Sequence, residues 1–150
     1  MVVYPSPKEL LPQRDRMNWL ERIDAHTSGR TICSVRVPED TPLSAPDGSL
    51  PGFAAIEFMA QAAAVHALLE QRALAEAAPG GVLNSFGRIL LLGSREIEFS
   101  RERYASGECL EVEVEVSSFS GSGLAVLACR VRDASGRELA QSRLNLLAQE

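Results

Sequence analysis

An apolar stretch from Gly52 to Leu69 constrains the fold most, because its only strongly polar side chains are Glu57, Gln61 and His66. Ala, Leu and Met favour helix, and no Pro or Gly interrupts the stretch after Gly52. We therefore predict a helix about 27 Å long at 1.5 Å per residue, with apolar residues on every face and burial on nearly all sides. The length approaches that of a membrane span, but the carboxylate, amide and imidazole indicate the core helix of a soluble protein.

Short strand-like segments lie on both sides of this helix. An extended lead-in at residues 1–8 is followed by segments 17–23 and 31–37, which a turn at 27–30 joins into a hairpin. A loop rich in Pro, Asp and Ser at 38–51 leads to the helix, which 78–81 should end. Further strands are predicted at 87–93 with 96–99, 109–116, 124–131 and 138–147.

The order of these elements predicts an α+β fold, in which a curved antiparallel sheet of five or six strands wraps the long helix. The 150 residues form a single domain, 1–150. Glu111, Glu113 and Glu115 alternate with apolar residues, so we expect the acidic row on a solvated sheet face. One sheet leaves part of the helix uncovered and its edge strands unpaired, so we expect a dimer.

Charge and motifs exclude several classes of function. A net charge of −5 gives no reason to expect nucleic acid or an anionic membrane as partner. No Gly-rich phosphate loop follows a strand, and neither histidine has a second metal ligand at useful spacing. Cys33, Cys109 and Cys129 lie in strand-like segments and are expected to be buried thiols. The first residues lack the pattern of a signal peptide, so we expect a cytoplasmic protein.

Glu57 needs an explanation, because burying an unpaired carboxylate costs several kcal/mol or keeps it protonated. Gln61 lies one helical turn further on the same face, where its amide can hydrogen-bond the carboxyl group. The two residues are either a structural pair or the proton-exchanging part of a cleft.

The helix start carries a family resemblance. Pro51-Gly52-x-x-x-Ile56-Glu57-x-Met59-Ala60-Gln61-Ala62 resembles the P-G-x-x-x-x-E-x-x-A-Q segment of the hotdog-fold beta-hydroxyacyl-(acyl carrier protein) dehydratases. Within this family the chain most resembles small dehydratase-like proteins of aryl-polyene and related polyketide pathways, in which D-G-x-x-P, here residues 47–51, precedes the helix. Other matching segments bring the resemblance to residues 9–147: Leu10-Leu11-Pro12-Gln13-Arg14-x-x-Met17, Gly93 with Arg95-x-Ile97-x-Phe99, and Gly107-Glu108-x-Leu110-x-Val112.

The resemblance implies removal of water from a 3-hydroxyacyl thioester, which is carried on the phosphopantetheine of an acyl carrier protein or coenzyme A. It implies no other cofactor. In the family, a loop histidine takes the proton alpha to the thioester, and a carboxyl group on the partner protomer's helix protonates the leaving hydroxyl. Glu57 matches that carboxyl group and Gln61 the residue that orients it. Backbone amides near Gly52 and Phe53 would polarise the carbonyl.

The loop histidine of the family has no counterpart here. Leu43 occupies its position when the segments are aligned without gaps from Pro51, and Thr41 does so when the shorter loop of the polyene-pathway proteins is used. Neither side chain can act as a base, and Gln13 replaces the histidine of the opening segment.

Neither histidine of the chain is expected to replace it. His66 lies about 180° round the helix from Glu57 and about 13 Å along it, so we expect a core or interface residue. His26, in the first hairpin, is expected at the surface.

We therefore predict a 3-hydroxyacyl-(acyl carrier protein) dehydratase-like protein of fatty-acid or aryl-polyene-like polyketide biosynthesis. Three alternatives stay open: Glu57 acts alone, the chain is a non-catalytic subunit beside a histidine-bearing hotdog partner, or it is an acyl thioesterase.

The expected partners are an acyl carrier protein and a second hotdog chain, identical or related. An acidic carrier would need a basic patch, for which the candidates are Arg14, Arg16, Arg22, Arg88, Arg101 and Arg103. Phe53, Phe58 and Met59 would line an acyl site or belong to the core.

Overall fold

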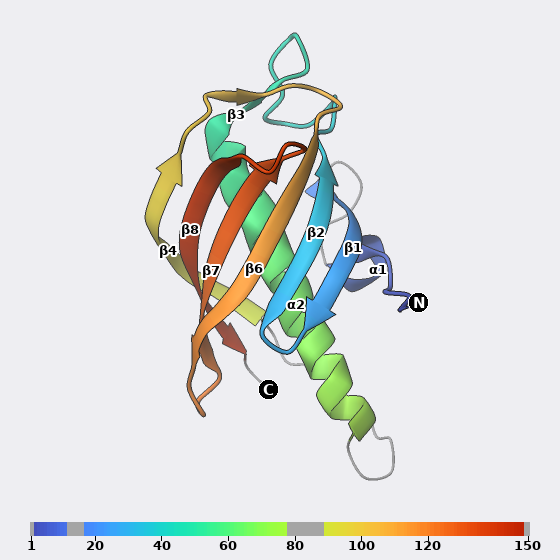
Figure 1. Ribbon diagram of the computed structural model, residues 1–150, viewed down its shortest axis with the longest axis vertical. Helices are drawn as coiled ribbons and strands as arrows, with labels where there is room; N and C mark the ends of the chain where they lie inside the picture. The colour runs from blue at the N-terminus through green and yellow to red at the C-terminus, as the bar shows by residue number, and fades with distance from the viewer. Residues whose placement is uncertain (1, 12–16, 78–88, 149–150) are drawn as a thin grey trace.

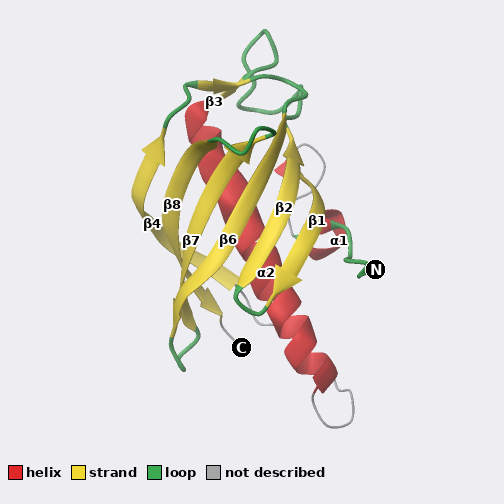
Figure 2. Ribbon diagram, viewed as in Figure 1, coloured by secondary structure: helices red, strands yellow, loops and turns green. Residues whose placement is uncertain are grey.

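The structure is a computed structural model that describes residues 2–11, 17–77 and 89–148. A six-stranded antiparallel sheet, in the order β1-β2-β6-β7-β8-β4, curves around the long helix α2 (Figures 1 and 2). Its strands are β1 Leu20–Thr27, β2 Arg30–Arg36, β4 Ile89–Phe99, β6 Cys109–Phe119, β7 Leu124–Asp133 and β8 Glu138–Ala148. The other elements are α1 Pro7–Leu10, the 3-10 turn η2 Gly52–Ala54, α2 Ala55–Ala77, and a small sheet of β3 Leu50–Pro51 with β5 Arg103–Tyr104.

This architecture confirms the predicted fold, with differences in detail. The helix continues past Leu69 to Ala77, and neither β3 nor β5 was predicted. The strand predicted at 87–93 with 96–99 corresponds to β4, which a bulge interrupts where Glu96 has a φ of 54°. Several predicted features lie outside the described residues: the helix stop at 78–81, the strand start at 87–88, the surroundings of Gln13, and Arg14, Arg16 and Arg88.

The sheet covers only one side of α2, so the prediction of burial on nearly all sides was wrong. Phe58, Met59, Ala62 and Val65 are completely buried against the sheet. The opposite face is only half-buried, and its residues are Ile56, Glu57, Ala60, Ala64, Ala67 and Leu68. By length and composition α2 could span a membrane, but packing against the sheet accounts for its apolar character.

Strand β4 forms one edge of the sheet and exposes an unusual number of large apolar side chains. Among the described residues it pairs with β8 on one side and with no strand on the other. An exposed, long, apolar edge strand invites pairing with another chain, which keeps the expectation of a dimer in place. The exposed side chains are Leu90, Leu91, Leu92, Ile97 and Phe99.

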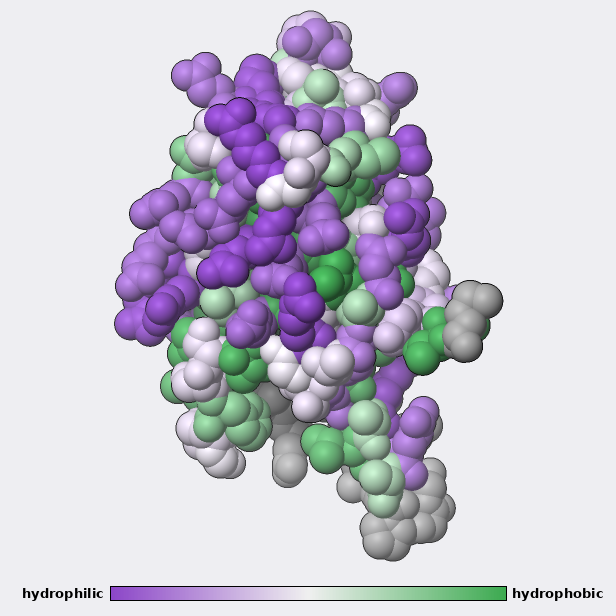
Figure 3. All heavy atoms as spheres, viewed as in Figure 1, coloured by the Kyte–Doolittle hydropathy of each residue, from purple (hydrophilic) through white to green (hydrophobic). Residues whose placement is uncertain are grey.

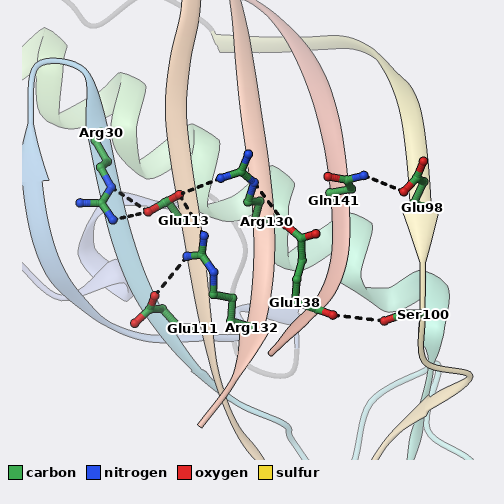
Figure 4. A network of polar contacts seen from close by, with 9 residues as sticks. All are labelled: Arg30, Glu98, Ser100, Glu111, Glu113, Arg130, Arg132, Glu138 and Gln141. Carbon is green, nitrogen blue, oxygen red and sulfur yellow. Dashed lines mark hydrogen bonds and ion pairs between the residues drawn. The ribbon is translucent and has the colours of Figure 1, made fainter. Parts of the chain in front are cut away.

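The outer face of the sheet is mostly hydrophilic, and ion pairs cross its strands (Figures 3 and 4). Glu113 points outward as predicted, but it is only 5% exposed and not solvated. Arg30 lies over it from β2, with Nε 2.7 Å from the carboxylate, and Arg130 and Arg132 approach from β7 at 3.8 and 3.5 Å. Burial opposes ionisation of Glu113, but its contacts with Arg30 and Arg132 outweigh burial and lower its pKa.

Two of the three cysteines are buried as predicted. Burial raises the pKa of the Cys33 and Cys129 thiols to about 12, so neither is a reactive thiolate at neutral pH. The prediction was wrong for Cys109, which is exposed at the start of β6. All three thiols are free.

Gly52 marks a close crossing of two chain segments at the helix start. Its N–H donates a 2.7 Å hydrogen bond to the Glu102 carbonyl, in the segment that leads into β5. A Cβ atom on Gly52 would lie 2.2 Å from the Arg101 carbonyl oxygen, which is closer than any real contact. Only glycine therefore lets the β5 segment lie against the entry to α2.

We predict that Glu113→Gln lowers the free energy of unfolding by about 1–3 kcal/mol, because charge-assisted hydrogen bonds to a buried carboxylate are lost. Glu115→Gln, on the same strand and face but exposed, should change it by less than about 0.5 kcal/mol. Urea unfolding at pH 7 measures both. Equal effects of the two substitutions would show that the arginines over Glu113 contribute little.

We also predict that Gly52→Ala destabilises the protein by about 1–3 kcal/mol, since the methyl group meets rigid backbone. Gly93→Ala is the matched control, because nothing lies within 4 Å of the added Cβ. Thermal unfolding of both variants separates steric conflict from a general effect of replacing glycine. An unchanged melting temperature for Gly52→Ala would contradict the close crossing.

Candidate active site

Glu57 lies in the first turn of α2, on the half-buried face that the sheet leaves uncovered. Its Oε1 accepts a 2.9 Å hydrogen bond from Nε2 of Gln61. The predicted contact between the two side chains is therefore present. Among the described residues, Oε2 of Glu57 has no recorded hydrogen bond, so this oxygen is available at the open face of the helix.

Gln61 is completely buried and holds three groups at once. Its Nε2 also donates to the Met17 carbonyl at 2.7 Å, and its Oε1 accepts from the Trp19 N–H at 3.0 Å. These partners define which side of the amide is nitrogen, because a carbonyl must accept and an N–H must donate. The segment leading into β1 thus fixes Gln61, and Gln61 in turn fixes the orientation of the Glu57 carboxyl group.

Three aromatic side chains, Trp19, Phe58 and Tyr104, pack together beside the same turn of the helix. The ring of Phe58 meets Trp19 edge-on at 5.5 Å between centroids and Tyr104 at 5.7 Å. Phe58 and Met59 are completely buried, so both belong to the core and do not line an acyl site. Phe53 is 56% exposed and stays a candidate for substrate contact.

The helix start offers fewer amide donors than the sequence indicates. The Gly52 N–H is taken by the Glu102 carbonyl, which corrects its predicted role as a donor to substrate. The Phe53 N–H follows it in η2 and, among the described backbone contacts, donates to no group outside its own helix. The first amides of a helix point outward and carry partial positive charge. The Phe53 amide is therefore the better candidate for polarising a carbonyl.

Thr41 and Leu43, at the position of the missing histidine, contain no base, and Thr41 shapes its own loop. The Thr41 hydroxyl accepts the Leu43 N–H at 3.1 Å and shares a 2.9 Å hydrogen bond with Ser44. Thr41 is buried and Leu43 is exposed. Thr41 thus forms a hydroxyl-stabilised turn, and any contact of either residue with substrate stays a prediction.

Asp47 and Arg103, whose structural roles the sequence analysis did not predict, hold the end of this loop against β5. Asp47 accepts hydrogen bonds from the N–H and hydroxyl of Ser49 at 2.9 and 2.6 Å, and these bonds lower the pKa of Asp47. Arg103 donates to the Ser49 hydroxyl and carbonyl at 2.6 and 3.0 Å. The D-G-x-x-P stretch, with its Asx turn, was the available signal for Asp47. Arg103 carries no comparable signal in the sequence.

Neither histidine of the chain reaches Glu57. His66 is buried as expected, whereas His26 is not at the surface but contacts Glu70, near the other end of α2. Glu57 and Glu70 are 13 positions apart, or about 20 Å along the helix axis. Among the described residues, the site therefore contains a positioned carboxyl group and no histidine.

The arginines proposed for a basic patch are already engaged where the structure describes them. Arg22 contacts Asp24 at 2.6 Å, Arg101 pairs with Glu108 and Arg103 binds Ser49. Arg14, Arg16 and Arg88 lie outside the described residues. A carrier-binding patch stays a prediction.

Comparison with known proteins points to one family and one fold. The sequence model of the ApeP-like family, described as ApeP dehydratase, matches residues 5–150. A comparison with curated protein sequences gives no match. Among solved structures, the dehydratase heterocomplex ApeI:P from Xenorhabdus doucetiae matches with a TM-score of 0.80 and 24% identity, over 99% of this chain and 93% of that one.

Thioesterases are also among the similar structures. A hypothetical thioesterase with coenzyme A from Streptococcus pneumoniae matches with a TM-score of 0.58 and 13% identity, over 85% of this chain and 84% of that one. A mutant thioesterase from Pseudomonas aeruginosa matches with a TM-score of 0.60 and 17% identity, over 84% and 78%. At these identities the structures show the hotdog fold alone. The family match covers nearly the whole chain, and the protein belongs to the ApeP-like dehydratase family.

Proposed function

We propose that this protein is the acid-bearing subunit of a heteromeric 3-hydroxyacyl thioester dehydratase in aryl-polyene-like or fatty-acid biosynthesis in the cytoplasm. Its substrate is carried on the phosphopantetheine of an acyl carrier protein or coenzyme A. The observation that carries the proposal is the placement of Glu57, which Gln61 orients on the uncovered face of α2 with neither histidine of the chain in reach.

The proposed chemistry divides one elimination between two groups. A base takes the proton alpha to the thioester, and the electrons of that C–H bond form the new double bond. The C–O bond at the beta carbon then breaks, and the Glu57 carboxyl group gives its proton to the hydroxyl, which leaves as water. The amide of Phe53 would stabilise the negative charge that develops on the thioester oxygen.

The missing base is assigned to a second hotdog chain. The half-buried face of α2 that carries Glu57 and the apolar edge of β4 are surfaces that a partner would cover. A related protein of this family was solved as a dehydratase heterocomplex, which supports a partner of the same fold. A partner on the open side of α2 would bring its loop histidine toward the free oxygen of Glu57.

A thioesterase function is the second candidate. The same Glu57, oriented by Gln61 and open on one side, could activate water against a thioester, and thioesterases share the fold. This reaction needs no second base from the loop. Its product is a free acid, which distinguishes it from an enoyl thioester.

The decisive measurement uses a 3-hydroxyacyl thioester on an acyl carrier protein, with the chain alone and mixed with a hotdog dehydratase chain that carries the loop histidine. We expect enoyl product only in the mixture, and at least about a 100-fold loss with Glu57→Gln, because general acid catalysis contributes that much. The glutamine amide still offers an oxygen to Gln61, so the fold should be kept. Glu76→Gln, exposed on the same helix, is the control and should leave the rate unchanged.

Each other outcome selects a different function. Turnover by the chain alone that Glu57→Gln abolishes would show that Glu57 acts without the histidine. A mixture that is insensitive to Glu57→Gln would make the chain a non-catalytic subunit. Free acid as the product would identify a thioesterase.

The assembly itself gives a separate prediction. Leu92→Lys places a charge on the exposed apolar edge strand β4. It should weaken association with the partner chain at least about tenfold, because a lysine on an edge strand opposes pairing with a strand of another chain. Phe119→Lys, an equally drastic change at an exposed site on β6, should not. Sedimentation of the mixed chains measures both. Unchanged association for Leu92→Lys would place the interface elsewhere.

A further inference from the structure

A second polar cluster lies along the second half of α2, away from Glu57, and takes no part in the proposed reaction. Glu70 Oε1 lies 2.9 Å from Nε2 of His26, and Nδ1 of His26 lies 2.8 Å from the Thr31 hydroxyl. The same hydroxyl lies 2.7 Å from Nδ1 of His66. The cluster therefore connects α2 to β1 through His26 and to β2 through Thr31 in one continuous chain of hydrogen bonds.

The cluster is shielded from water at one end and open at the other. Thr31 is completely buried and His66 nearly so, while the side chains of His26 and Glu70 are 15% and 33% exposed. The row Glu70–His26–Thr31 has the acid, histidine and hydroxyl order of a catalytic triad. A completely buried hydroxyl cannot attack a substrate, so a hydrolytic role for this row is excluded. The cluster can, however, exchange protons with solvent through His26.

The cluster keeps all of its hydrogen bonds when one proton is added to it. With Glu70 ionised, Nε2 of His26 carries a hydrogen, and neutral His26 accepts the Thr31 hydroxyl while His66 donates to it. When His26 is protonated, its Nδ1 donates to Thr31, whose hydroxyl turns to donate to His66. The hydrogen of His66 then sits on Nε2.

A second proton cannot be accommodated in this way. Both Nδ1 atoms would then be donors facing one hydroxyl oxygen, and the Thr31 hydrogen would lose its acceptors in a completely buried place. The two charged rings would lie 5.2 Å apart between centroids. Burial, followed by the charge of His26, lowers the pKa of His66 from 6.5 to about 4.

The groups recorded around the cluster among the described residues do not relieve this conflict. Glu70 is the one carboxylate that contacts either histidine ring, and it faces His26, not His66. From the N-terminal segment, the Tyr4 hydroxyl accepts the backbone N–H of His26 at 3.1 Å. On the neighbouring strand β6, the residue opposite Thr31 is Val114, which is apolar.

The C-terminal part of α2 depends on this cluster for its attachment. Leu69 is the last buried residue of the helix, and every residue from Glu70 to Ala77 is partly or fully exposed. Among the described residues, His66 and Glu70 are the last residues of α2 whose side chains hydrogen-bond to the sheet. We propose that Glu70, His26, Thr31 and His66 form a proton-sensitive clamp that holds this end of α2 on the β1–β2 hairpin and releases it when both histidines are protonated.

The direction of the pH dependence follows from proton binding. The released form, in which His66 has its ordinary pKa of 6.5, binds the proton more readily than the closed form, whose pKa is about 4. The clamp is therefore fully effective above pH 6.5 and weakens as the pH falls toward 4. At pH 5 this difference favours release by about 30-fold relative to pH 7.5.

Amide hydrogen exchange tests the clamp on the intact chain at pH 7.5 and 5.0. After correction for the intrinsic exchange rates, protection of residues 70–77 should fall by up to about 30-fold at pH 5.0, while residues 58–63 keep theirs. His66→Gln, which cannot take a proton, should remove this pH dependence. Equal losses in both segments, no loss, or an undiminished loss in His66→Gln would overturn the proposal.

A second measurement covers the case in which His66→Gln does not fold. The nitrogen shifts of the His66 ring in the unmodified protein report its protonation directly. We expect the ring to stay neutral in the closed form down to about pH 5. Protonation of His66 near its ordinary pKa of 6.5, with residues 70–77 still protected, would also overturn the clamp.

Discussion

The structure depends on one constraint: a long apolar helix is buried by a single curved sheet, and one sheet can cover only one side of it. Large side chains such as Phe58 and Val65 fill the covered side, whereas small ones such as Ala60 and Ala64 occupy the other. The uncovered side is also where Glu57 can meet a substrate or a partner. The incomplete burial of α2 therefore leaves open the face on which the proposed catalytic carboxyl group lies.

The sequence was sufficient for those parts of the site that depend on local spacing. Glu57 and Gln61 are one helical turn apart, so their contact follows from helix geometry alone. The other partners of Gln61 are 42 and 44 residues away in the chain. Such contacts depend on how the lead-in to β1 packs, and no periodicity in the sequence reports that. The close crossing at Gly52 escaped prediction for the same reason.

Side-chain direction was also easier to predict than burial. Alternation along β6 correctly put Glu113 on the outer face, but three arginines from neighbouring strands bury it there. The hairpin around His26 was predicted, yet its histidine faces α2 and is mostly buried. In both cases the outcome depends on strand register, because register decides which long side chain lies opposite which. A single sequence does not contain that information in readable form.

The different contacts of Gln61 and Glu57 support the proposed catalytic site. Gln61 has a structural reason to be present, since its buried amide satisfies a carbonyl and an N–H of the lead-in as well as Glu57. Glu57 has little such reason, because it is half-buried and, among the described residues, hydrogen-bonds only to Gln61. This arrangement, a carboxyl group with few structural contacts held in one orientation by a residue that the fold needs, supports the proposed catalytic role of Glu57. Thr41 and Leu43, at the position of the family's histidine, contain no base, which is why the proposed elimination assigns that base to a partner chain.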